Sequence, residues 1–138
     1  MTMMTNEEYL VECLKTESSN MDKIRARLDD PRIIRLMHAL MGMSTEANEA
    51  MSMLKAHIFY GRPLDLSNLK EEFGDSNWFQ NIGIDVVRDF GEPCSREILD
   101  QMNVNKLQGV RFDKGIFTED QANNRDLAAE RKVLESSE

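Results

Sequence analysis

The sequence predicts an all-α protein, a helical bundle with two long antiparallel helices that carry acidic motifs, assembled as an oligomer. Apolar residues recur at the three- and four-residue spacing of amphipathic helices over most of the chain. No stretch shows the alternation of apolar and polar residues that is typical of strands. Glycine and proline fall between the periodic stretches, where helices end. We expect residues 1–138 to form a single domain, since this length suits one.

Two short helices are expected near the N-terminus. Thr5 or Asn6 can cap the first, and the two glutamates that follow suit a first helical turn, where the macrodipole favours negative charge. The polar run KTESSN, residues 15–20, ends this helix. Residues 21–28 can form the second.

The first long helix is predicted from Asp30 to just before Gly61. Asp30 is a candidate N-cap, and Pro31 suits the first helical position, where its missing N–H costs nothing. Apolar residues then follow a helical spacing between positions 33 and 58, and Gly61 with the proline two residues later ends the helix. A helix of nearly 30 residues is long for a globular domain, and it favours a bundle.

Three further helices are predicted after a turn. The second long helix runs from about 68 to 90 and stops at a Gly-Glu-Pro sequence, and the third covers roughly 95–108. Residues 109–117 form an irregular link. A last, polar helix opens with the capping-box spacing at Thr118 and extends to about Glu135.

Two pairs of acidic residues are the candidate chemical centre. Glu46 and Glu49 are three residues apart and share one face of the first long helix, and Glu72 and Asp75 repeat that arrangement on the second. Antiparallel packing would bring the pairs face to face. Four clustered carboxylates need cations to stay ionised, and all-oxygen ligation suits Mg²⁺ or Mn²⁺. The alternative interpretation is two solvated helix faces.

The composition limits the classes of partner. The net charge of −8 disfavours binding to DNA or RNA polymers, although a small phosphate ligand bridged by cations is compatible with it. No apolar run approaches the roughly 20 residues that span a bilayer, and the N-terminus has no signal-peptide core. We therefore expect no membrane partner and a cytoplasmic location.

The acidic pairs also carry a resemblance. With 22 intervening residues, they resemble the ExxE and ExxD motifs of the MazG-like all-α nucleoside triphosphate pyrophosphohydrolases. The segments LKAHIFYGRPLDLSNLKEEFGDSNWF and NKLQGVRFDKGIFTEDQANNRDLAAER look like the small phage-encoded branch of that family, and the likeness extends from Leu36 to Glu130. Thr45 departs from the pattern, because many relatives have an additional acid there.

The resemblance implies a reaction: a nucleoside triphosphate and water give the monophosphate and pyrophosphate. It implies two or more Mg²⁺ or Mn²⁺ ions held by the four acids, with Glu46 or Glu49 also taking the proton of the attacking water. A phage-type enzyme, which would act in the host cytoplasm, favours purine deoxynucleotides, dGTP first and dATP second. The resemblance leaves open whether the chain belongs to the MazZ sub-branch of phages that replace adenine with 2-aminoadenine.

Three cations are candidates for contacts with the β- and γ-phosphates: Lys55, Lys106 and Arg111. Lys55 follows the first acidic pair on the same helix, and the other two lie in the tail motif. Arginine would bind phosphate as a planar fork and lysine as a point charge. The alternative interpretation of each is a surface or subunit ion pair.

Three residues after the second acidic pair are candidates for contacts with the base. Trp78 could stack on it, while Asn77 and Asn81 could hydrogen-bond its edge or line the pocket. Packing in the core or at an interface is the other interpretation of Trp78, and surface capping that of the two asparagines.

Two function classes follow from these patterns. The first is a Mg²⁺-dependent pyrophosphohydrolase acting on purine, or alternatively pyrimidine (dUTP, dCTP), deoxynucleotides as a homodimer or homotetramer. The second is a non-catalytic helical assembly protein whose acids are merely solvated. The sequence contains no P-loop, dinucleotide-binding turn or nucleophile elbow.

Overall fold

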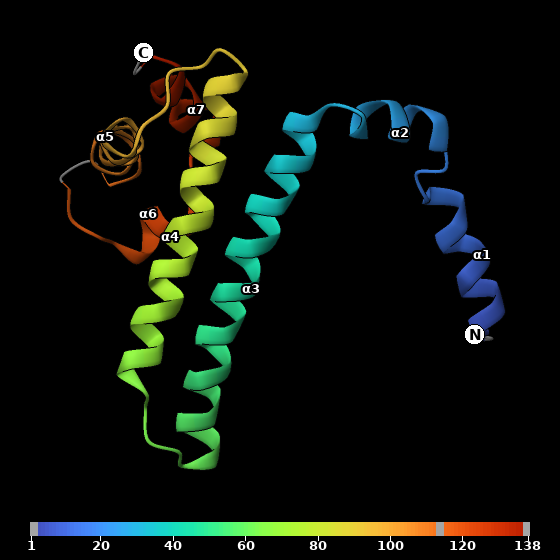
Figure 1. Cartoon of the computed structure of the whole chain (residues 1–138), viewed down its shortest axis with the longest axis horizontal. Helices are drawn as coiled ribbons and strands as arrows, with labels where there is room; N and C mark the ends of the chain where they lie inside the picture. The colour runs from blue at the N-terminus through green and yellow to red at the C-terminus, as the bar shows by residue number, and fades with distance from the viewer. Residues whose placement is uncertain (1–2, 113–114, 137–138) are drawn as a thin grey trace. The chain divides into compact units, whose positions relative to one another are not determined.

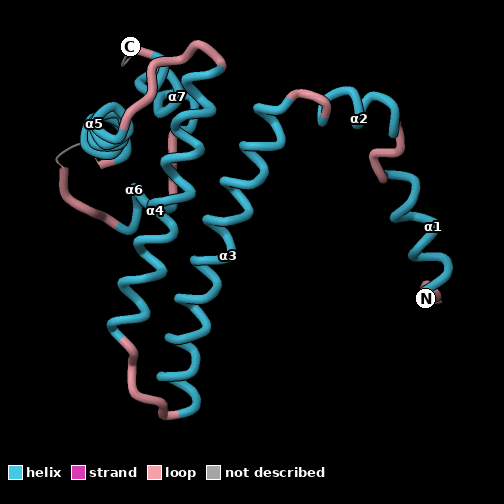
Figure 2. Tube along the Cα trace, viewed as in Figure 1, coloured by secondary structure: helices cyan, strands magenta, loops and turns pink. Residues whose placement is uncertain are grey.

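The computed structural model describes residues 3–112 and 115–136, and all its regular elements are helical (Figure 2). The all-α prediction is confirmed, with no strand in the described ranges. Asp113 and Lys114, in the link predicted between the third and last helices, lie outside these ranges. The elements are α1 (Asn6–Thr16), α2 (Met21–Leu28), α3 (Pro31–Tyr60), α4 (Leu66–Asp89), α5 (Arg96–Lys106), the π-helical turn η1 (Leu107–Arg111), α6 (Glu119–Asn123) and α7 (Leu127–Glu135).

The chain divides into two compact units, one up to Ile34 and the other from Arg35 onward. In the first unit, α1 starts with a capping box: the Glu8 N–H donates to Thr5 Oγ1 (3.2 Å), and the Thr5 N–H donates to Glu8 Oε2 (2.7 Å). Asn20 caps α2 in a similar way. Neither helix contains a buried residue, so local caps rather than burial define their ends.

The second unit is built on α3 and α4, which lie side by side after a short connection (Figure 1). Gly61 ends α3 in a left-handed conformation, at φ 66°, which glycine adopts without strain. Asp65 caps α4, because its Oδ1 accepts from the N–H groups of Ser67 and Asn68. The caps and the glycine together determine where α3 ends and α4 begins.

The helices α5 and α7 pack on one another and on η1. Between them lies an apolar cavity of about 400 Å³. Its lining comes from the end of α4, the following loop, α5 and α7: Val87, Glu92, Pro93, Cys94, Ile98, Leu99, Met102 and Leu134.

The predicted last helix is wrong in one respect, because the structure breaks it into α6 and α7. Thr118 caps α6 as expected. The chain then leaves helical geometry at Asn124 (φ −110°, ψ 68°), and the Asp126 side chain accepts from the Ala129 N–H, which starts a new helix. A second difference concerns Leu107–Arg111, which is π-helical although an irregular link was expected from residue 109.

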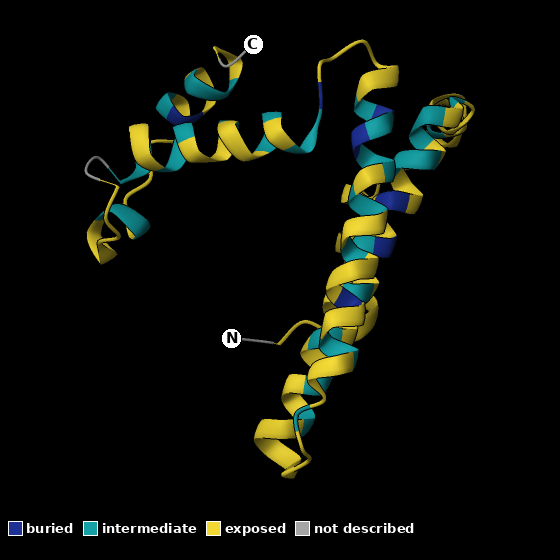
Figure 3. Ribbon diagram, turned by 60° about the vertical axis from the view of Figure 1, so that its left-hand side comes forward, coloured by how far each residue is buried: buried dark blue, intermediate teal, exposed yellow. Residues whose placement is uncertain are grey.

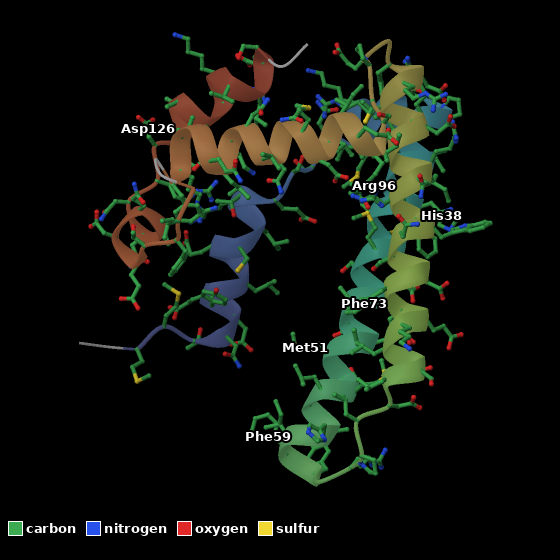
Figure 4. The ribbon with its side chains drawn as sticks, turned by 90° about the vertical axis from the view of Figure 1, so that its left-hand side faces the viewer. His38, Met51, Phe59, Phe73, Arg96 and Asp126 are labelled. Carbon is green, nitrogen blue, oxygen red and sulfur yellow. The ribbon has the colours of Figure 1, made fainter. Side chains whose placement is uncertain are left out.

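The buried core is small. Among the described residues, the buried apolar side chains are those of Ala39, Ile84, Val86 and Cys94 (dark blue in Figure 3, which also colours buried polar residues). Large apolar side chains stay exposed on both long helices; Phe59 and Trp78 are 73% and 70% exposed. Figure 4 labels Met51 and Phe59 on α3, which are 61% and 73% exposed. Within the described part of the chain, no helix combines the length and apolar character needed to cross a membrane.

Candidate metal centre

Three of the four predicted metal-ligating carboxylates converge in the structure. Glu46 and Glu49 lie one turn apart on α3, and Glu72 meets them from α4. One carboxylate oxygen of each residue lies within 4.8 Å of the other two. Glu72 is 5% exposed, Glu46 is half-buried and Glu49 is exposed. The cluster therefore has a buried base and an open side, and its donors are all oxygens, which suit a hard divalent cation.

The close approach of α3 and α4 brings these acids together. A Cβ atom on Gly42 would lie only 2.3 Å from the Phe79 ring, so only glycine allows this contact. The Phe79 ring also contacts His38, edge to face, with ring centroids 5.5 Å apart. One turn after Gly42 comes Glu46. The packing of one ring against one glycine thus sets the distance between the acid-bearing faces.

The electrostatics of the cluster favour a bound cation. Burial raises the pKa of Glu72 above its usual range, and a hydrogen bond with Glu46 and the negative charges of Glu49, Glu46 and Glu71 raise it further. A carboxyl group in this state holds its proton where an exposed glutamate is ionised. A cation would replace that proton and remove the repulsion.

Asp75, the fourth predicted ligand, does not join the three glutamates. It is exposed on α4, one turn beyond Glu72, and is not among the carboxylates that come within 4.8 Å of one another. Its role as a ligand therefore stays a prediction.

The three predicted base-binding residues come together in one groove. Asn77, Trp78 and Asn81 line it, and its volume is about 470 Å³. The remaining lining residues come from α3 and from the same side of α4: Arg35, Gly74, Ile82 and Asp85. The Arg96 guanidinium donates to Asn77 Oδ1, and the Asn81 amide donates to the Asn77 carbonyl (2.8 Å), so both amides already have partners.

This groove lies on a different side of α4 from the acidic cluster. Asn81 follows Glu72 by nine residues, which places it about 180° around the helix. Trp78 follows Glu72 by six residues, about 120° around and about 9 Å along. The structure therefore groups the base-binding candidates with one another but not with the metal-binding candidates of the same chain.

An ion-pair network borders the groove. Arg35 on α3 pairs with Asp85 and with Asp89, the latter at 2.5 Å. The hydrogen bond from Arg35 lowers the pKa of Asp85 below its usual range. These charges hold the start of α3 to the end of α4, and they were not recognised from the sequence because the partners are about 50 residues apart.

Lys55 is not placed with the other candidates. Its ammonium lies 6.0 Å from the centre of the Tyr60 ring, a cation–π distance. It follows Glu49 by six residues, about 9 Å along α3. Its predicted contact with phosphate is not tested by this position.

Lys106 and Arg111, the other predicted phosphate contacts, gather around a buried carboxylate. Glu130 on α7 is 4% exposed and accepts from Arg125 at Nη2 (2.6 Å) and Nε (3.2 Å). The hydrogen bond from Arg125 lowers the pKa of Glu130, and the nearby charges of Arg111 and Lys106 lower it further. Arg111 Nε is buried with no hydrogen-bond partner in the described structure. Three cations around one carboxylate leave an excess of positive charge that suits an anion.

Sequence reasoning missed Asn68, Arg125 and Glu130. Asn68 precedes Glu72 by four residues, a spacing that puts an amide beside a carboxylate on one helix face. Arg125 and Glu130 are five residues apart across the break between α6 and α7, so their pairing could not be anticipated while that region was taken as one helix.

Comparison of this chain with family models, curated proteins and solved structures gives no match. The assignment of a function therefore depends on the side-chain chemistry described above and on the resemblance of the motifs.

Proposed function

We propose that this chain is a Mg²⁺-dependent nucleoside triphosphate pyrophosphohydrolase, converting a triphosphate and water to the monophosphate and pyrophosphate. The observation that carries the proposal is the convergence of Glu46, Glu49 and Glu72 from two helices, with Glu72 almost fully buried. Burying a carboxylate beside two others is costly unless a cation compensates it. Solvated acids would instead separate.

The three glutamates fit a hard divalent ion, Mg²⁺ or Mn²⁺, since they present only oxygen donors and have an open side for substrate. Asp75 would complete the set after a side-chain rotation. When bound, two or more such ions would neutralise phosphate charge and lower the pKa of a water molecule. The exposed Glu49 or the half-buried Glu46 would take the proton of that water as it attacks the α-phosphorus, and the bond to the pyrophosphate oxygen would break.

The other candidate residues would bind the rest of the nucleotide. Lys106 and Arg111, with Arg125, would contact the β- and γ-phosphates, and Lys55 is a further candidate. The support for this assignment is the excess positive charge around Glu130 and the partnerless Arg111 Nε.

The base would stack on Trp78, whose ring is 70% exposed, with Asn77 and Asn81 beside it. We expect a purine deoxynucleotide, dGTP first and dATP second, because of the phage-like motifs and because a larger base stacks better. The same chemistry on dUTP or dCTP is the alternative.

The active unit would be a homodimer or homotetramer of antiparallel long helices, acting in the cytoplasm. Glu72 lies 17 residues before the end of α4, about 26 Å along the helix. The cations around Glu130 come from later in the chain: Lys106 ends α5, Arg111 ends η1, and Arg125 lies between α6 and α7. A second copy would allow the acids of one chain and the cations of another to bind the same triphosphate. Exposed Met51, Phe59 and Trp78 support the same conclusion.

The test is product analysis across the eight ribo- and deoxynucleoside triphosphates with Mg²⁺. We expect monophosphate and pyrophosphate to appear together, fastest from dGTP. Sequential release of a diphosphate and free phosphate would refute the reaction. A clear preference for dUTP or dCTP would leave the reaction standing and refute the substrate assignment.

A second function is favoured by one observation, the large exposed apolar surface: a non-catalytic helical assembly protein. A Mg²⁺ titration of thermal stability separates the two. A carboxylate site is stabilised by about 2.7 kcal/mol when Mg²⁺ is at 100 times its dissociation constant, whereas a solvated face is not stabilised.

A further inference from the structure

Asn68 makes two contacts that place it between the two acid-bearing helices. Its Nδ2 donates to Glu72 Oε1 at 3.2 Å on the same helix. The same nitrogen lies 3.0 Å from the Met53 sulfur on α3. We propose that Asn68 is a positioning residue that holds the Glu72 carboxylate in the orientation needed to bind a divalent cation. This inference rests on the proposed function, since it concerns the same site.

Glu72 needs such a partner because its surroundings repel it. Its side chain is buried beside Glu46 and Glu49. In the part of the chain that the structure describes, no nitrogen of lysine, arginine or histidine lies within 4.0 Å of its oxygens. A carboxyl group that is buried beside two others and has no cationic partner is one whose charged form a bound cation would stabilise. Without a donor on one side, a carboxylate among carboxylates would rotate away from them.

The local structure of α4 places Asn68 for this role. Asn68 lies in the first turn of α4, and its backbone N–H is held by Asp65 Oδ1 at 3.0 Å. Four residues separate it from Glu72, so both side chains lie on one helix face. Its two neighbours, a carboxylate oxygen and a thioether sulfur, are both acceptors, so the amide nitrogen must face them. An amide supplies two N–H groups and no charge, and it therefore orients Glu72 without competing with a cation.

The expected effect is on cation affinity more than on folding. Partners that orient metal ligands change metal affinity or activity by about 10- to 100-fold when they are removed. Replacing Asn68 by leucine keeps a similar volume against Met53 and leaves the backbone bond to Asp65 intact. Turnover at saturating Mn²⁺ should therefore recover, while the Mn²⁺ concentration needed for half-maximal turnover rises.

The experiment measures Mn²⁺ binding to the full chain by electron paramagnetic resonance, for the wild type, Asn68→Leu and Asn124→Leu. Asn124 is the matched control, because its Nδ2 donates to Asp120 Oδ1 at 2.9 Å with the same four-residue spacing, outside the acidic cluster. Circular dichroism and thermal unfolding without metal check that each variant folds. The Mn²⁺ dependence of turnover provides the second readout.

We expect Asn68→Leu to bind Mn²⁺ at least 10-fold more weakly, with Asn124→Leu unchanged and metal-free unfolding similar in all three. Equal Mn²⁺ affinity in the wild type and Asn68→Leu would overturn the role of Asn68 while leaving the metal site intact. Equal losses in both leucine variants would also overturn it, since the effect would then be general. A wild-type chain that binds no Mn²⁺ would refute the metal site itself, and with it this inference.

Discussion

The contact between Gly42 and Phe79 offers a quantitative test of how α3 and α4 bring the acids together. The perturbation is Gly42→Ala, which adds one methyl group. Its carbon would lie 2.3 Å from the ring, whereas non-bonded carbons keep about 3.5 Å or more. The ring or the helices must therefore move by about 1.2 Å (3.5 − 2.3). Overpacking of this kind costs about 1–3 kcal/mol.

An opposing effect reduces this cost. Replacing glycine by alanine inside a helix stabilises it by about 0.5–1 kcal/mol. The net expectation for Gly42→Ala is a loss of about 0–2.5 kcal/mol, which lowers the melting temperature of a chain this size by up to roughly 10 °C. Because the displacement separates Glu46 from Glu72, the stabilisation by Mg²⁺ should also shrink.

The matched control is Gly74→Ala on α4, where an added Cβ would meet no atom within 4 Å. It should stabilise the protein by about 0.5–1 kcal/mol, the opposite sign. Urea unfolding of both variants, with and without Mg²⁺, measures the two effects. If Gly42→Ala stabilises the chain as much as Gly74→Ala, the close helix approach is refuted as the feature that aligns the acids.

Three further predictions follow from the same site. Glu49→Gln and Asp75→Asn should each lower kcat more than 10-fold while circular dichroism stays helical, since losing a metal ligand costs several kcal/mol. If both variants keep more than about a tenth of the wild-type kcat, neither residue is a metal ligand. Without metal, wild-type stability should fall as pH rises through the raised pKa of Glu72, because the ionised form is the unfavourable one in the folded state. Glu72→Gln has no ionisable group at this position, so its free energy of unfolding relative to the wild type should increase with pH above about 4.5. Urea unfolding at several pH values measures this, and a pH-independent difference between the two proteins would contradict the burial of Glu72 as the cause. Light scattering should give at least twice the chain mass of 15.9 kDa where activity is full; a monomer mass would contradict the shared site.

Local signals predicted the helices well. Asp30 with Pro31 marked the start of α3, and Gly61 marked its end, because capping and left-handed glycine depend on neighbouring residues only. The break between α6 and α7 was missed. Thr118 was recognised as a cap, but Asp126 caps a second helix eight residues later, and a polar stretch with few apolar residues has no periodicity to reveal such an interruption.

The candidate site was predicted in part because helical spacing determines faces but not distances. The i, i+3 spacing placed Glu46 beside Glu49, and α3–α4 packing then brought Glu72 to them. Asp75 has the same spacing from Glu72, yet it is exposed and stays outside the cluster, because sharing a helix face does not fix which residue reaches the neighbouring helix.

Contacts between distant segments could not be predicted from spacing. The gathering of Lys106 and Arg111 around Glu130 depends on how α7 packs on α5, and the contact of Asn68 with Met53 depends on the separation of α3 and α4. Both involve the tertiary arrangement rather than a local pattern.

The most direct test of the central claim is hydrolysis of dGTP by the wild-type chain with Mg²⁺ in water labelled with heavy oxygen. The account predicts dGMP carrying one labelled oxygen on its phosphate and unlabelled pyrophosphate, because water attacks the α-phosphorus. Mass spectrometry of the two products measures this. Label in the pyrophosphate, or release of free phosphate, would contradict the proposed reaction, and absence of turnover on all eight nucleotides would contradict the assignment as an enzyme of this class.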